Sequence, residues 1–161
     1  MAVELDEIDL VLLTELERDA DRPNVELARI VGLSPAATLN RVRRLKDSGA
    51  ITGIHAELDA GTVGYPLEVY VAVTLSQHEE RAEERFEKLV KRLPQIISAD
   101  WITGETDVLM ELVARDVEEL QGVLTMLSRG GAQRVLTFLR LRRLKPHSPL
   151  PLRGGPPRRG E

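Results

Sequence analysis

The sequence contains no cysteine, and its three histidines stand far apart along 161 residues. The missing cysteines exclude disulfide bonds and thiolate ligands for a metal. His55, His78 and His147 are too scattered to suggest a ligand cluster. No Ser-His-Asp set, carboxylate pair or phosphate-binding loop is recognisable either. We therefore predict no metal site, no cofactor and no enzymatic activity.

Long apolar runs are also missing. No window approaches the roughly 18 consecutive apolar residues of a membrane-spanning helix. The N-terminal sequence MAVELDEIDL lacks the basic segment and apolar run of a secretory signal. We therefore expect a soluble cytoplasmic protein without a membrane partner. The length and the ordinary apolar fraction allow one large domain or two small ones.

Residues 1–49 are predicted to form a three-helix DNA-binding domain. Apolar residues spaced by one helical turn place the first helix over residues 5–20, with Asp6 as its N-cap. The unit is expected to close at residues 48–49, where a glycine follows a serine.

The junction between the second and third helices has a strong local pattern. Asn24 is of the type that caps a helix start, and Gly32 can take the positive φ that ends this helix. Ser34 is a good N-cap for the next helix, and Pro35 suits its first position. The pattern predicts a tight turn between two helices, as in a helix-turn-helix.

A rotation of about 100° per residue sorts the side chains of the third helix onto two faces. The face expected to point into the core contains Pro35, Thr38, Leu39, Val42 and Leu45. Small residues and long donors form the other face and its flanks, namely Ala36, Ala37, Asn40, Arg43 and Arg44, with Arg41 and Lys46 beside them. Small residues let a helix approach base edges, and the donors can reach bases or phosphates. A basic face that is merely solvated is the alternative.

Basic charge is concentrated in this stretch, although the formal net charge of the chain is -4. Between residues 29 and 46 there is no acid, and the cations are Arg29, Arg41, Arg43, Arg44 and Lys46. Residues 1–21 carry eight acids against Arg18 alone, so that surface should be kept away from phosphates. The local basic footprint favours DNA binding.

Residues 50–64 mix a short extended pattern with three glycines, and we place the boundary between two units here. This stretch could be a plain linker, or it could form a β-hairpin arm or a dimer-swapped strand. Residues 146–161 contain five of the nine prolines and are predicted to form a flexible Pro/Arg-rich tail. An inert tail and an auxiliary contact with DNA or a partner are both compatible with this composition.

Residues 65–145 are predicted to form a ferredoxin-like βαββαβ domain. Alternation and helical periods place strands at 67–75, 96–103, 106–114 and 134–144, with helices starting near residues 76 and 116. The first of these helices has a Ser76–Glu79 capping box and stops at Pro94. Both helices on one face of the sheet leave the other face open, so we expect oligomerisation. The fold class is therefore α+β.

Three stretches resemble the Lrp/AsnC family of prokaryotic transcription regulators, also called leucine-responsive or feast/famine regulators. They are LDEIDLVLLTEL, then NVELARIVGLSPAATLNRVRRLKDSGAITGIHAELD, then a βαββαβ unit with ITGETDVLM at its centre. The resemblance covers nearly everything up to residue 145 and leaves the tail outside.

This resemblance implies a sequence-specific regulator that binds double-stranded DNA and responds to an amino-acid-like effector. It implies dimers formed through the sheet domain, which assemble into tetramers or octamers. The DNA contacts that it implies include Ser34 and Pro35 besides Asn40 and the arginines, and the effector contacts that it implies centre on Gly104 and Asp107.

The residues themselves indicate the effector site less directly. Gly104 would bare a backbone N–H for a carboxylate, and Asp107 or Glu105 could accept an ammonium group. The candidate set is Thr103, Gly104, Glu105, Thr106 and Asp107. An ordinary hairpin connection explains the same sequence. The family often has an aromatic residue where Thr106 stands here.

Two other functions are compatible with parts of this sequence. A DNA-wrapping architectural protein without an effector would fit the departure at Thr106. An enzyme similar to the sirohaem decarboxylases would share this fold. That chemistry should need basic and histidine residues in the sheet domain, and the only histidine between residues 61 and 139 is His78.

Overall fold

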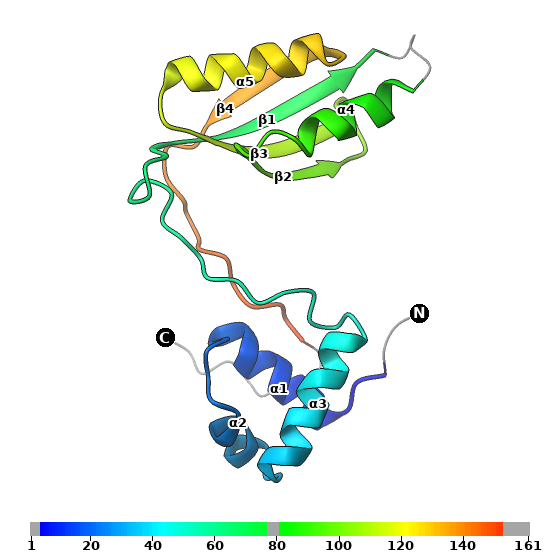
Figure 1. Ribbon diagram of the computed structural model, residues 1–161, viewed down its shortest axis with the longest axis vertical. Coiled ribbons are helices and arrows are strands. Elements are labelled where there is room, and N and C mark those ends of the chain that lie inside the picture. Colours follow the sequence, from blue (N-terminus) through cyan, green and yellow to red (C-terminus); the bar gives the residue numbers. More distant parts are fainter. Residues whose placement is uncertain (1–3, 77–80, 153–161) are drawn as a thin grey trace. The chain divides into compact units, whose positions relative to one another are not determined.

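The computed structural model describes residues 4–76 and 81–152 and divides the chain into two compact units (Figure 1). The helical unit contains residues 1–57 and 145–161, and the sheet unit contains residues 58–144. Three helices in the first and a βαββαβ unit in the second confirm the predicted fold class.

The helical unit contains α1 (Glu7–Arg18), α2 (Asn24–Val31) and α3 (Pro35–Asp47). Asp6 caps α1 as predicted, and Gly32 ends α2 with a φ of 69°. Ser34 accepts a hydrogen bond from the Ala37 N–H at 3.2 Å and so caps α3. The apolar core consists of Leu12, Leu27 and Leu45, one from each helix, with partly buried residues around them.

Two expectations for this unit were wrong. Asn24 is the first residue of α2, and Pro23 occupies the cap position before it. The Asn24 side chain does not cap the helix, because its amide donates to the Pro35 carbonyl at 2.8 Å. The asparagine therefore ties the start of α2 to the start of α3. Leu39 is not in the core, since 39% of it is exposed, whereas the neighbouring Thr38 is fully buried. Pro35 is exposed as well.

The sheet unit contains four antiparallel strands in the order β2-β3-β1-β4. Helices α4 and α5 cover one face of this sheet (Figure 1). The elements are β1 (Leu67–Leu75), α4 (Ala82–Val90), β2 (Ile96–Trp101), β3 (Val108–Ala114), α5 (Val117–Arg129) and β4 (Ala132–Leu139).

Alternation in the two central strands places their large apolar residues under the helices. Val69, Val71 and Val73 of β1 lie beside Val108, Met110 and Leu112 of β3, and all six are buried. Phe86 from α4 and Val123 and Leu127 from α5 close this core. Burying such side chains stabilises the unit by about 1.5–3 kcal/mol each.

The last strand ends earlier than predicted, at Leu139 rather than residue 144. The reason is its partner, because β1 begins at Leu67 and the pairing stops beside it, with the Arg140 N–H donating to the Glu68 carbonyl. In the predicted capping box before α4, Glu79 lies outside the described residues, and α4 begins after Arg81.

Residues 50–64 contain no strand; all of them are described. A turn occupies their end, where the Asp59 carboxylate accepts the Thr62 N–H at 2.7 Å and the Tyr65 N–H donates to Ala60. The part of the tail that the structure describes, residues 146–152, contacts the helical unit, since the Leu150 N–H donates to Glu17 of α1 at 2.9 Å. The flexibility predicted for residues 146–161 stays a prediction.

Candidate functional site

The outward face of α3 presents four side chains at the spacing i, i+3, i+4 and i+7. They are Ala36, Leu39, Asn40 and Arg43, and all four are exposed. A helix that lies in the major groove presents reading residues at this spacing. The set offers a small residue, an apolar contact, an amide and a guanidinium, which are the chemistries that distinguish base edges.

Two of the predicted DNA-contacting arginines are engaged within the domain. The Arg41 guanidinium donates to Asp6 at 2.5 Å and to Asp9 at 3.0 Å, and the Arg44 guanidinium donates to the other Asp9 oxygen. Asp6 and Asp9 are also joined in a capping box at the start of α1. We call these four side chains the Asp9 network.

Burial makes this network a strong constraint on α3. The Asp9 side chain is fully buried, so its charge has to be balanced by the two arginines and by the Asp6 N–H. Hydrogen bonds from the Asp9 backbone and from Arg41 lower the pKa of Asp6, and Asp6 in turn raises the pKa of Arg41. The network fixes the rotation of α3 against α1.

Asp9 was not among the site residues predicted from the sequence, although the sequence contains a signal for it. A helical period places Asp9 on the apolar stripe of α1, three residues before the buried Leu12. An acid on an apolar stripe will be buried, so it predicts a cationic partner for its carboxylate. The acidic segment that was expected to be kept from phosphates binds two of the five cations between residues 29 and 46.

The other two cations of α3 remain available to contact DNA. Arg43 and Lys46 are exposed, and within residues 4–76 and 81–152 no ion pair joins either to an acid. Ser34, Pro35 and Ala36 are exposed at the start of α3, while Ala37 is half-buried. The predicted contacts therefore lie together on α3 and its cap.

The predicted effector residues form the connection between β2 and β3. Gly104 has a φ of +131°, which favours glycine. The Asp107 carboxylate accepts the Leu75 N–H at 2.8 Å, and the Glu105 carbonyl accepts the Thr74 hydroxyl at 3.3 Å. These bonds tie the turn to the end of β1, so it has a structural role. Its contact with an effector stays a prediction.

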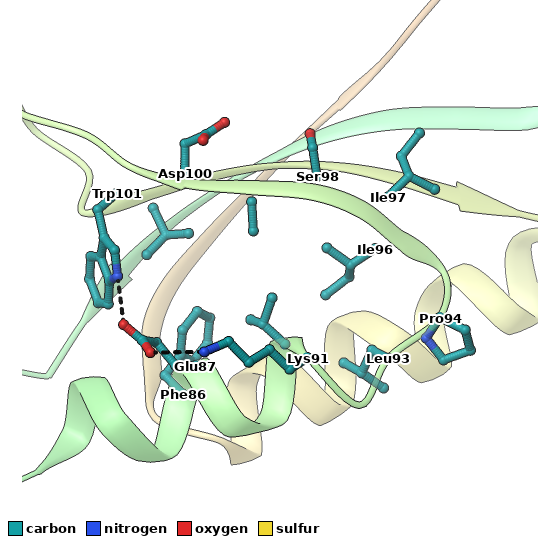
Figure 2. A pocket seen from close by; sticks show the side chains of 13 residues that line it. Phe86, Glu87, Lys91, Leu93, Pro94, Ile96, Ile97, Ser98, Asp100 and Trp101 are labelled. Carbon is teal, nitrogen blue, oxygen red and sulfur yellow. Dashed lines mark hydrogen bonds and ion pairs between the residues drawn. The ribbon is translucent and has the colours of Figure 1, made fainter. Parts of the chain in front are cut away.

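A groove of about 480 Å³ lies between α4 and the edge strand β2 (Figure 2). Its apolar lining includes Phe86, Val90, Leu93, Ile96 and Val108. Glu87 stands at its rim, where it accepts the Trp101 indole N–H at 3.1 Å and pairs with Lys91 at 3.4 Å. These bonds lower the pKa of Glu87. The sequence by itself did not predict this groove.

The face of the sheet away from the helices carries exposed apolar side chains. Tyr70 and Phe138 are directly paired in register between β1 and β4, with 36% and 53% of each residue exposed. At one end of this face, Arg140 forms ion pairs with Glu68 and with Glu111. We call this surface the open face.

Comparisons with known proteins agree with both units. The AsnC-type helix-turn-helix domain matches residues 5–46, and the Lrp/AsnC ligand binding domain matches residues 68–150. The chain belongs to the Lrp/AsnC family. It is 34% identical to the leucine-responsive regulatory protein of Rhizobium meliloti over 145 residues, which is 89% of this chain and 93% of that protein.

Other members of the Lrp/AsnC family are similar over different lengths. The HTH-type transcriptional regulator AldR of Mycobacterium tuberculosis is 36% identical over 73% of this chain, and the match spans 66% of AldR. A transcriptional regulator from Neisseria meningitidis, solved as a complex with L-Met, has a TM-score of 0.85 and 30% identity. That likeness covers 92% of this chain and 97% of the solved chain.

Membership of the Lrp/AsnC family confirms the predicted function of an effector-responsive, DNA-binding transcription regulator. The proteins from Rhizobium meliloti, Mycobacterium tuberculosis and Neisseria meningitidis are all named as regulators. Within the described ranges no helix is both long and apolar enough to cross a membrane. In the same ranges no group of three acidic or histidine side chains could hold a metal.

Proposed function

We propose that this chain binds operator DNA through the outward face of α3 and that Arg41 and Arg44 orient this helix instead of contacting phosphates. The Asp9 network carries the proposal, because it engages both guanidinia and leaves Arg43 and Lys46 free among the described residues. The proposed contact surface also includes Ser34, Pro35, Ala36, Ala37 and Asn40. The capping serine and the small residues lie at the end of α3 that would enter the DNA major groove.

The salt dependence of binding tests this assignment. Each phosphate contact contributes about 0.9 to the slope of log K against log salt. Lys46→Ala should therefore reduce the slope by about 0.9 per bound subunit, whereas Arg41→Ala should leave the slope unchanged and lower the melting temperature. Lys88→Ala, which removes an exposed cation of α4, is the matched control.

Two results would contradict parts of this proposal. An equal loss of slope in Arg41→Ala and Lys46→Ala would return Arg41 to the phosphate contacts. Absence of sequence-dependent binding, with footprints that simply grow with oligomer size, would favour a DNA-wrapping protein over a regulator of a few operators.

We further propose that a second copy of the chain covers the open face. Its exposed Tyr70 and Phe138 supply an apolar centre, and the Arg140 ion pairs supply a charged edge. A dimer would present two α3 helices to successive major grooves about 34 Å apart. Phe138→Asp should convert the dimer to monomers in a size-exclusion mass measurement, and an unchanged mass would exclude this face.

The ligand half of the proposed function is an amino-acid-like effector acting on assembly or DNA affinity. It is supported by the match to the Lrp/AsnC ligand binding domain and by a similar regulator solved with L-Met. An amino-acid panel at millimolar concentration should raise the melting temperature, because a ligand that binds only the folded state stabilises it. If no amino acid does so, the ligand half fails while the DNA half stands.

A further inference from the structure

We propose that the arginine-rich end of the chain, residues 153–161, binds phosphates of the DNA beside the site that α3 reads. Residues 146–152, which dock on α1, anchor this end to the helical unit. The inference rests on the proposed DNA binding and adds a second contact to it, one that does not depend on base sequence. We call residues 153–161 the basic tail.

The residues just before the basic tail return the chain to the DNA-binding unit. The Leu150 N–H donates to the Glu17 carboxylate of α1 at 2.9 Å. The Leu152 N–H then donates to the Leu150 carbonyl at 2.9 Å in a tight turn, and Leu152 is half-buried. The chain from residue 145 onward therefore belongs to the helical unit, although it follows directly on the sheet unit.

The basic tail differs in charge from the rest of the chain. It carries Arg153, Arg158 and Arg159 against Glu161. Residues 140–161 contain seven of the 22 cations of the chain and one of its 26 acids, although the formal net charge is -4. The other residues of the tail are glycine and proline, which supply little apolar surface for a core. Such a composition suits an external anionic partner.

The acids of α1 are the alternative partner within the chain, because the tail follows a segment docked on this helix. Several of these acids are already engaged. Asp6 and Asp9 belong to the Asp9 network, and Glu15 pairs with Arg22 at 2.9 Å. Double-stranded DNA offers one charge about every 1.7 Å along its axis and releases counterions when cations bind. Three arginines therefore gain more from DNA phosphates than from the acids of α1.

The basic tail is long enough to extend past the helical unit. Its nine residues span at most about 30 Å when extended, at about 3.3 Å per residue. Helix α3, with 13 residues, is about 20 Å long at about 1.5 Å per residue. A tail anchored at α1 can therefore reach phosphates beside the groove that α3 enters. Phosphate contacts carry no sequence information, so the tail adds affinity and leaves base preference to α3.

Salt dependence measures this contact directly. A chain that ends at Leu152 lacks the three tail arginines, so its slope of log K against log salt should fall by up to about 2.7 per subunit, at about 0.9 per phosphate. Arg153→Gln/Arg158→Gln/Arg159→Gln should show the same loss. Lysine at the same three positions is the matched control and should keep most of the slope. Affinity for operator and for unrelated DNA should fall by similar factors.

The length of the DNA locates the contact. On a duplex trimmed to the operator, the full chain and the chain that ends at Leu152 should bind alike. Flanks of one helical turn, about ten base pairs on each side, should strengthen binding of the full chain more than binding of the shortened chain. A gain that is equal in both proteins would place the contact outside the basic tail.

A variant without the anchor separates docking from charge. Leu150→Pro removes the N–H that Glu17 accepts and leaves every charge in place. It should weaken binding to flanked DNA severalfold at a fixed salt concentration, because a loose tail has a lower effective concentration at the flank, and it should leave the slope unchanged. Leu150→Ala keeps the N–H and replaces a side chain that is 65% exposed, so this matched control should bind like the wild type.

Three outcomes would overturn the inference. An unchanged slope in the shortened chain would exclude the tail contact, and a lower melting temperature of that chain would then show that the tail binds α1 instead. Equal affinities of Leu150→Pro and the wild type for flanked DNA would exclude the anchor. A full chain that binds no DNA would overturn this inference together with the proposed DNA binding. By contrast, a tail-dependent slope without operator preference would contradict only the reading by α3.

Discussion

The two units of this chain are stabilised in different ways. Among the residues that the structure describes, the sheet unit has a core of twelve buried apolar residues around Phe86, whereas the apolar cluster of the helical unit buries only Leu12, Leu27 and Leu45. The helical unit also buries the charge of Asp9. A small domain has little apolar surface to bury, so the ionic network is a larger share of what holds it.

This difference couples stability to DNA binding in the helical unit. The arginines that hold α3 lie on the same helix as the residues proposed to read DNA. In the sheet unit, by contrast, the core lies under the helices, and the groove rim and the open face can change without touching it. We expect some mutations in α3 to lower stability and others to weaken DNA binding, with little overlap between the two sets.

The largest expected effect is in the apolar core of the sheet unit. Phe86→Ala should destabilise that unit by about 3–5 kcal/mol, because it leaves a large cavity. Trp101, which lies in the same unit, should report unfolding at lower urea. Helix content from the helical unit should persist beyond that transition. Loss of both signals together at the lower urea concentration would contradict the difference between the units.

A somewhat smaller effect is expected from the Asp9 network. The double variant Arg41→Ala/Arg44→Ala leaves a buried carboxylate without a cationic partner, which should cost about 2–3 kcal/mol, reduced from the fully buried case by the exposure of the arginines. Urea unfolding followed by circular dichroism measures it. Arg43→Ala/Lys46→Ala is the matched control and should change stability little. Adding Asp9→Asn to the first pair should recover part of the loss.

Acid should lower the stability of the sheet unit by protonating Glu119. Arg115 and Gln95 lower the pKa of Glu119 to about 2 from its ordinary value near 4.5. A lowered pKa stabilises the fold when the group is ionised, so this contribution is full above about pH 4.5, falls as the pH drops toward 2 and is absent below. Melting temperatures of Glu119→Gln should vary less over this window than those of the wild type.

The smallest effect on stability is expected for Leu39. It is partly exposed on the outward face of α3, so Leu39→Ala should change stability by no more than about 0.5 kcal/mol. If Leu39 contacts a thymine methyl group, replacing one thymine of the operator by uracil should weaken the wild type and leave Leu39→Ala unaffected. Equal penalties in both proteins would show that Leu39 does not read DNA.

Much of the fold followed from local patterns. Gly32, Ser34 and Pro35 predicted the junction of α2 and α3, because capping and backbone conformation depend on neighbouring residues. The alternation in residues 67–75 predicted β1 with its observed bounds. The end of β4 could not be predicted in this way, since it depends on where β1 begins.

The candidate DNA surface was predicted in position but not in detail. The sequence placed the contacts on α3, yet it assigned Leu39 to the core and counted Arg41 and Arg44 among the DNA contacts together with Arg43. Which side of a helix faces inward is decided by the elements packed on it. Here α1 supplies Asp9, an acid more than thirty residues away in sequence. The groove likewise needs the register of β2 against β3 before Trp101 lies over Glu87.

The sequence by itself determined the two units, the helix-turn-helix junction and the basic stretch from Arg29 to Lys46. These features follow from propensity, periodicity and charge, which act between near neighbours. Only the tertiary structure decided which arginines are free, which face of the sheet is open and where residues 146–152 dock. Those outcomes depend on pairing between distant segments, because a buried carboxylate selects the cations that reach it and a packed helix fixes what remains exposed.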